Sequence, residues 1–150
     1  MKLAQALVER ADLQKRLAQL RRRLLLNAKV QEGEMPAEDP KELLRELEGL
    51  VSELESLITR INLTNAGVLE GEEPLTALLA RRDCLKIRGE ALREFLYEAS
   101  ETVMRGTRSE VVVRSTVEVA ALQKQVDALS KELRELDLRI QQINWTTELV

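Results

Sequence analysis

The sequence has 150 residues and a formal net charge of −3, and its 23 basic and 26 acidic side chains are interspersed. This balance excludes an acidic tail or a basic arm, so the sequence does not indicate a nucleic-acid partner. Hydrophobic residues make up 44% of the chain but aromatic residues only 2%, which is typical of long amphipathic helices and unlike a mixed α/β enzyme.

The residues needed for several kinds of chemistry are missing. Histidine is absent and Cys84 is the single cysteine. Histidine-dependent nucleophiles and histidine-bearing zinc or di-iron sites are therefore excluded, and no intrachain disulfide can form. No glycine-rich phosphate loop occurs. We expect no catalytic constellation, no metal site and no cofactor, with Cys84 half-buried in a helix; the composition favours a protein that is not an enzyme.

The N-terminal stretch predicts the compartment. A charge at Glu9 interrupts it before the continuous apolar core of a signal peptide could form. No uncharged apolar run approaches the ~18 residues of a membrane-spanning helix. We therefore expect a cytoplasmic protein with no membrane partner.

A first helix is predicted over about 3–28. Its apolar residues alternate at steps of three and four, the heptad period, with Arg10 as one charged residue on the seam. A loop with Gly33 and Pro36 follows. Asp39 before Pro40 is a strong start signal for the next helix, because aspartate caps well and proline suits the first helical position.

A second helix is predicted over about 40–62, with Leu44, Val51 and Ile58 lying beside its main seam. This stripe is wider than a two-stranded coiled coil needs, so the helix should touch more than one neighbour. Gly67, Gly71 and the residues around them predict a loop.

A third helix is predicted over about 75–105, with Arg82 on its seam. A β-branched run at about 110–114 predicts a short strand. A fourth helix over about 116–144 begins with the capping-box pattern of Ser115 and Glu118. The fourth helix aligns with the second when Ile143-Asn144 is set beside Ile61-Asn62, which raises internal duplication as a hypothesis.

Together these elements predict an all-α fold, an antiparallel up-down bundle or coiled coil of four long helices in a single domain, 1–150. The loops at 29–39 and 106–115 then lie at one end, where residues 29–32 could pair with 111–114 as a two-stranded β-ribbon. The other end gathers the N-terminal turn, the second loop, the start of the third helix and the C-terminal tail.

Several sequence blocks resemble a bacterial family that carries the name septicolysin or is left as a domain of unknown function. The likeness covers essentially the whole chain, and it implies a small helical protein without an established activity, cofactor or catalytic residue. The blocks are Glu9 to Arg16, Asn27 to Gly33, Ala80 to Asp83, Ser115 to Lys124 and Asn144 to Leu149.

The polar end is the candidate ligand-binding site, because the bundle topology brings seven polar or aromatic residues towards it: Arg10, Asn62, Asn65, Arg82, Asp83, Asn144 and Trp145. An arginine on a helix seam must find carboxylates or carbonyls, since burying it unpaired costs several kcal/mol. One interpretation is a structural polar layer that fixes register or oligomeric state. The other is a pocket for a small anion or a nucleotide.

The function expected from the sequence is that of a structural or interaction protein. We expect a helical bundle that associates as a homo-oligomer through apolar helix stripes that packing within one chain does not cover. The alternative is an anion- or nucleotide-binding protein, or a Mg-dependent phosphohydrolase, that uses the polar end. For the hydrolase, the acidic pairs Glu9/Asp12 and Glu132/Glu135 have the required helical spacing.

Overall fold

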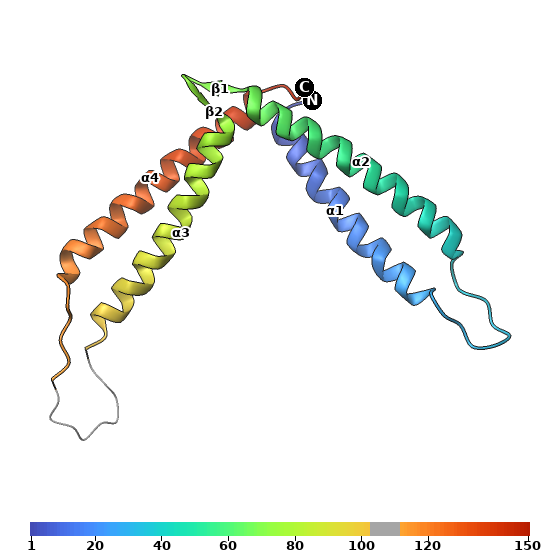
Figure 1. Ribbon diagram of the computed structural model, residues 1–150, viewed down its shortest axis with the longest axis horizontal. Coiled ribbons are helices and arrows are strands. Elements are labelled where there is room, and N and C mark those ends of the chain that lie inside the picture. The colour runs from blue at the N-terminus through green and yellow to red at the C-terminus, as the bar shows by residue number, and fades with distance from the viewer. Residues whose placement is uncertain (103–111) are drawn as a thin grey trace. The chain divides into compact units, whose positions relative to one another are not determined.

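The computed structural model describes residues 1–102 and 112–150, and these form two helical hairpins (Figure 1). Residues 1–74 and 142–150 make one compact unit, and residues 75–141 make the other. The elements are α1 (Leu3–Leu26), α2 (Pro40–Gly67), β1 (Leu69–Glu70), β2 (Glu73–Pro74), α3 (Leu75–Ser100) and α4 (Val119–Thr146). The predicted all-α class with four long helices is confirmed.

Hairpin 1 consists of α1 and α2, which run side by side in opposite directions (Figure 1). Its seam is built from apolar residues at heptad spacing, so that one stripe of each helix faces the other. The buried apolar residues of α1 are Leu3, Ala4, Ala6, Leu13 and Leu20, and those of α2 are Leu43, Leu50, Leu57 and Ile61.

The start of α2 follows the sequence signal and its end does not. The Asp39 carboxylate accepts a hydrogen bond from the Lys41 N–H at 2.9 Å, and Pro40 occupies the first helical position. The helix continues beyond the expected end at about 62, because the buried Thr64 extends the seam by another turn. The Thr64 hydroxyl donates to the Arg60 carbonyl at 2.8 Å, which keeps this polar side chain satisfied within the helix.

The two-stranded ribbon is present, but at a different place from the predicted strand. Strands β1 and β2 pair antiparallel across a tight turn in which Gly71 has φ +65°, a backbone conformation that glycine adopts without strain. Residues 29–32 and 112–114 carry no strand, and residues 110 and 111 lie outside the described residues. In residues 112–114, the described part of the run, β-branched side chains alone do not make a strand, because a strand also needs a paired neighbour.

Hairpin 2 consists of α3 and α4, which also lie side by side (Figure 1). Near its loop end Leu96, Leu122 and Val126 form a buried cluster. At Gly89 the helices approach so closely that a Cβ atom would come within 2.9 Å of the Leu129 Cδ2 atom.

The bounds of α3 and α4 differ from the predicted ones. α3 ends at Ser100 rather than at about 105, although residues 103–105 lie outside the described residues. α4 begins at Val119, because the Glu118 carbonyl, and not that of Ser115, accepts the first helical hydrogen bond, from the Leu122 N–H at 3.1 Å. The Ser115 hydroxyl instead donates to the Val117 carbonyl at 2.9 Å in the preceding bend.

The two hairpins repeat the same pattern. α2 and α4 each have 28 residues, and setting their ends in register pairs buried Leu43, Leu50, Leu57 and Ile61 with buried Leu122, Leu129, Leu136 and Ile140. The alignment expected from the sequence is wrong by less than a helical turn, since it places the exposed Leu44 on the buried Val126. Burial, and not the shared Asn-x-Thr tails, sets the register of the repeat.

Candidate functional site

Five of the seven residues of the expected polar cluster belong to the first unit. Asn144 is buried in the last turn of α4, and its neighbour Trp145 is exposed. Asn62 is exposed and Asn65 is half-buried in the last turns of α2. Arg10 is half-buried in α1.

The polar end of hairpin 1 is occupied largely by the chain's own C-terminal tail. The Leu3 N–H donates to the Thr147 carbonyl at 2.9 Å, and the Leu149 N–H donates to the Met1 carbonyl at 2.8 Å. On the other side of the tail, the Val150 N–H donates to the Thr64 hydroxyl at 3.1 Å. The donors and acceptors of these bonds are backbone groups and the Thr64 hydroxyl.

Charged groups also hold the C-terminal tail on this end of hairpin 1. The Arg60 Nε donates to the Val150 carbonyl oxygen at 2.7 Å, and the Lys2 ammonium contacts the Glu148 carboxylate at 2.7 Å. The hydrogen bond from Lys2, aided by the N-terminal ammonium, lowers the pKa of Glu148 below its ordinary value. Because Glu148 is exposed, this pair adds little stability.

The other two residues of the expected cluster, Arg82 and Asp83, belong to the second unit. They form an ion pair with each other at 2.8 Å, through adjacent positions of α3. Arg10 and Arg82 each lie seven residues, one heptad, after the buried leucine that starts the first helix of their hairpin, Leu3 or Leu75. The repeat by itself accounts for their matching positions in the sequence.

One face of hairpin 1 is charged. Arg23 of α1 contacts Glu46 of α2 at 3.4 Å and Glu38 of the connecting loop at 2.6 Å. Towards the termini, Glu9 of α1 shares a small cleft of about 170 Å³ with Glu53 and Arg60 of α2. The residues Glu9, Arg16 and Arg23 form one row of α1, seven apart, and Glu46, Glu53 and Arg60 form one row of α2.

A buried asparagine, which the sequence interpretation missed, completes the loop end of the charged face. The Asn27 amide donates to the Arg23 carbonyl at 2.8 Å, and its side-chain oxygen accepts from the Glu38 N–H at 3.0 Å. The bidentate hydrogen bonds from Arg23 lower the pKa of Glu38 and raise that of Arg23. Asn27 could have been suspected from its place directly after the helical period ends, where a polar side chain often caps.

The opposite face of hairpin 1 is apolar. At 100° per residue, the row of Leu44, Val51 and Ile58 lies about 160° around α2 from the charged row. On α1 the row of Ala11, Ala18 and Leu25 lies on the same side, with the row of Leu7, Gln14 and Arg21 between it and α2. Leu44 is 51% exposed, Val51 44% and Leu25 69%, while Ile58 is half-buried and both alanines are exposed. We call these six residues the apolar face.

Charges of opposite sign border the apolar face. On the α1 side lie the exposed basic residues Lys15 and Arg22, while the exposed Arg21 lies between the α1 row and α2. On the α2 side lie the exposed acidic residues Glu48 and Glu55, which share their row with the exposed Lys41 near the start of the helix. The sequence identified the α2 row as surplus apolar surface. It did not identify the α1 row, because alanines carry little hydrophobic signal.

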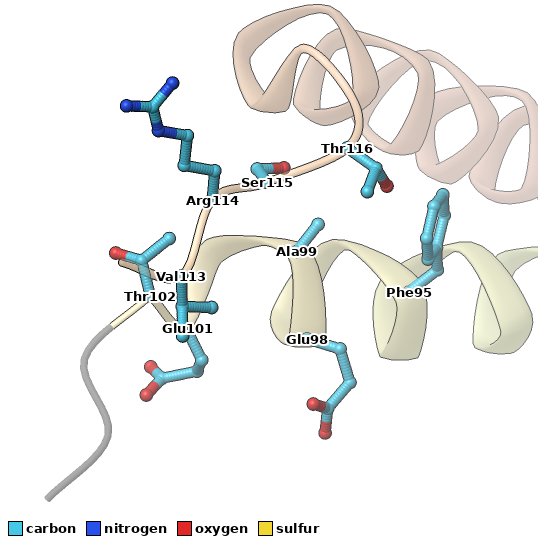
Figure 2. Close-up of a pocket in the computed structure, with 9 residues that line it drawn as sticks. All are labelled: Phe95, Glu98, Ala99, Glu101, Thr102, Val113, Arg114, Ser115 and Thr116. Carbon is cyan, nitrogen blue, oxygen red and sulfur yellow. The ribbon is translucent and has the colours of Figure 1, made fainter. Parts of the chain in front are cut away.

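Hairpin 2 has a small pocket near its loop end, between the last turns of α3 and the segment before α4, with a volume of about 210 Å³ (Figure 2). Phe95 and Ala99 point towards that segment, whereas the Glu98 carboxylate and the Arg114 guanidinium point away in different directions. The pocket is thus bordered by apolar and hydroxyl groups without converging charges. This arrangement does not fit an anion or a nucleotide.

Other side chains differ from expectation or bear on chemistry. Cys84 is exposed and not half-buried as expected, because its position on α3 faces away from the seam. All three aromatic residues, Phe95, Tyr97 and Trp145, are exposed. Within residues 1–102 and 112–150, acidic and thiol side chains form no group of three that could hold a metal ion. In the same part of the chain, every helix is too short or too polar to cross a membrane.

Comparison with known proteins places the chain in a family. No curated protein matches it. A crystal structure of a functionally unknown conserved protein from Corynebacterium diphtheriae is 38% identical in sequence, with a TM-score of 0.94 over 100% of this chain and 99% of that one. A family model, described as a family of unknown function, matches residues 10–149. The chain therefore belongs to this family, DUF6847.

Proposed function

We propose that this protein is a cytoplasmic interaction protein whose helical hairpins associate with further copies of the chain. The proposal keeps the septicolysin resemblance as a family likeness and assigns no toxin activity to it. The observation that carries the proposal is the apolar face of hairpin 1, where Leu25, Leu44 and Val51 are exposed and are not covered by the hairpin itself.

Hairpin 2 shows that a hairpin of this design does not need such a face. With the helices in register, Leu44, Val51 and Ile58 of α2 correspond to Gln123, Ser130 and Asp137 of α4. On the other helix, Ala11 and Ala18 of α1 correspond to Asp83 and Glu90 of α3, and Leu25 corresponds to the exposed Tyr97. Because the buried rows are shared and this face is not, the apolar residues serve a purpose other than closing the hairpin.

The area that the chain leaves exposed supports the same proposal. Its accessible surface is 11431 Å². Two separate compact bodies that share its mass of 17.1 kDa equally would expose about 9,300 Å². The difference, about 2,000 Å², is larger than the ~800 Å² that each partner contributes to a standard interface.

The exposed aromatic residues point in the same direction. Aromatic side chains are enriched at protein interfaces, where their large apolar area is covered by a partner. A chain with only three of them normally buries them in its core, since each removes 150–250 Å² or so from water. Here all three are left on the surface.

The oligomeric state in solution tests the proposal. Sedimentation equilibrium and light scattering over a range of micromolar concentrations should give a mass that is a multiple of 17.1 kDa. Dilution should lower the average mass if the exchange is reversible. A mass of 17.1 kDa at every concentration would contradict the proposal.

A further inference from the structure

We propose that the apolar face of hairpin 1 packs against the same face of a second copy, so that the two hairpins form a four-helix bundle in which α2 of each copy lies over α1 of the other. This inference rests on the proposed self-association and names its surface, its occupant and its geometry. Two helical hairpins that cover each other's open faces are a common way to complete such a bundle.

The level of each residue along hairpin 1 follows from contacts within it. Arg23 of α1 contacts Glu46 of α2, and Glu9 shares a cleft with Arg60. Counting inwards from these two levels, Ala18 lies level with Val51, Leu25 with Leu44, and Ala11 with Ile58. The rise per residue is the same in both helices, so the correspondence holds along the whole face.

A two-fold axis parallel to the helices preserves these levels between copies. It places α2 of one copy over α1 of the other, antiparallel to it, with Val51 opposite Ala18 and Ile58 opposite Ala11 of the second copy. At these two levels a large side chain faces a small one, whereas Leu44 faces Leu25, so two of the three levels alternate large with small as interdigitating layers do. The contact is self-complementary, as a two-fold interface must be.

The bordering charges favour this arrangement over the other two-fold arrangement, in which α1 lies over α1 and α2 lies over α2. With α2 over α1 of the second copy, Glu48 lies at the level of Arg21 and Arg22, and Glu55 lies within a residue of the level of Lys15. With like helices stacked instead, Glu48 and Glu55 would face glutamates, and the basic residues would face one another. Opposite charges across the border favour the first arrangement, because juxtaposed like charges are strongly unfavourable at an interface.

The repeat supplies the variant that tests the face. The substitutions Leu44→Gln, Val51→Ser and Ile58→Asp give α2 the residues that α4 carries at the equivalent positions, so the hairpin has a precedent for folding with them. We expect normal helicity by circular dichroism. The dissociation constant for self-association, measured by sedimentation, should rise by about tenfold or more. The control is Leu138→Gln, which changes an exposed leucine of α4 and should leave the association unchanged.

Cross-linking tests the pairing of helices. In a Cys84→Ser background, Ala18→Cys and Val51→Cys chains are mixed and oxidised. We expect a covalent dimer in the mixture and much less in either variant alone. Efficient cross-linking of Val51→Cys alone would instead indicate like helices stacked, and would overturn the arrangement.

The outcomes separate this inference from the proposed function. Suppose that the parent protein is oligomeric, that the triple variant associates as strongly as the parent, and that the mixed cysteine variants give no covalent dimer. Another surface then holds the oligomer, so the inference is wrong while the proposed function stands. If the parent protein is monomeric at every concentration, both are wrong. A Glu48→Lys, Glu55→Lys variant, which changes only exposed residues, should weaken association in the same direction without affecting folding.

Discussion

At their loop ends the two hairpins carry opposite chemistry at equivalent positions. Hairpin 1 has Arg23, which is clamped to Glu38 and supported by Asn27. Hairpin 2 has Phe95 at the matching place, half exposed beside a small pocket. At equivalent positions, therefore, the loop end of hairpin 1 is held by hydrogen bonds, and the loop end of hairpin 2 carries an exposed aromatic ring.

A second difference lies in the seam. Where α1 has Leu17, α3 has Gly89, and the missing side chain lets α3 and α4 approach closely. Hairpin 1 fills its seam with side chains and keeps an apolar face, whereas hairpin 2 narrows its seam and has polar or charged residues at five of the six matching positions, with Tyr97 at the sixth. The difference shows that the seam alone is enough to form a hairpin, so the extra apolar surface of hairpin 1 is available for a partner.

The largest effect should come from the shared seam. Leu13 is 1% exposed, and its equivalent Leu85 is also buried. Leu13→Ala should cost ~2–5 kcal/mol of unfolding free energy, because it removes buried methyl groups and leaves a cavity. Urea denaturation of Leu13→Ala and Leu85→Ala tests whether the two seams contribute alike. A cost below 1 kcal/mol or so in either would contradict a core at that position.

Gly89→Leu should give hairpin 2 the side chain that hairpin 1 has at Leu17, and it should destabilise the protein by ~1–3 kcal/mol. The reason is that the first added carbon already falls within 2.9 Å of the buried Leu129 side chain. Thermal denaturation measures the cost. Leu17→Gly in hairpin 1 is the reciprocal change, and a gain in stability in either variant would mean that the two seams are interchangeable.

Gly49→Ala should act in the opposite direction. Gly49 is an exposed residue in the middle of α2 with no atom within 4 Å of an added Cβ, and α4 carries Ala128 at the equivalent position. We expect stabilisation by about 0.5–1 kcal/mol, since alanine is the better helix former and the unfolded chain loses freedom. Chemical denaturation checks the sign, and destabilisation would indicate that something covers this position.

The smallest effect concerns pH and the loop clamp of hairpin 1. The hydrogen bond from Arg23 lowers the pKa of Glu38 in the folded state, so its contribution to stability is fully present above the ordinary glutamate pKa of about 4.3 and is lost as the pH falls through the lower folded value. Thermal denaturation of the parent and of Arg23→Gln should therefore differ most near neutral pH and converge in acid. The pair is exposed, so the difference should be small.

A control for the pH series is needed because the pKa of Glu148 is lowered as well. A Glu148→Gln background removes that second acid-sensitive group. If the parent and Arg23→Gln curves stay equally far apart from neutral to acid pH in this background, the clamp does not depend on the ionisation of Glu38.

The sequence by itself determined the features that follow from local period and residue chemistry. Heptad spacing predicted four helices, Asp39-Pro40 predicted the start of α2 within a residue, and Leu44, Val51 and Ile58 were recognised as surplus apolar surface. These signals are local, since helix periodicity and capping depend on residues within a few turns of one another.

The tertiary structure decided the features that depend on which chain segments meet. The ribbon formed at β1 and β2 because those residues find a partner across a tight turn, and α2 continued to Gly67 because Thr64 is covered by the C-terminal tail. The apolar face became visible once the contact of Arg23 with Glu46 fixed which rows of α1 and α2 share a side. Ala11 and Ala18 carry too little hydrophobicity to mark a face in the sequence, and they gain that role from the helix packed beside them.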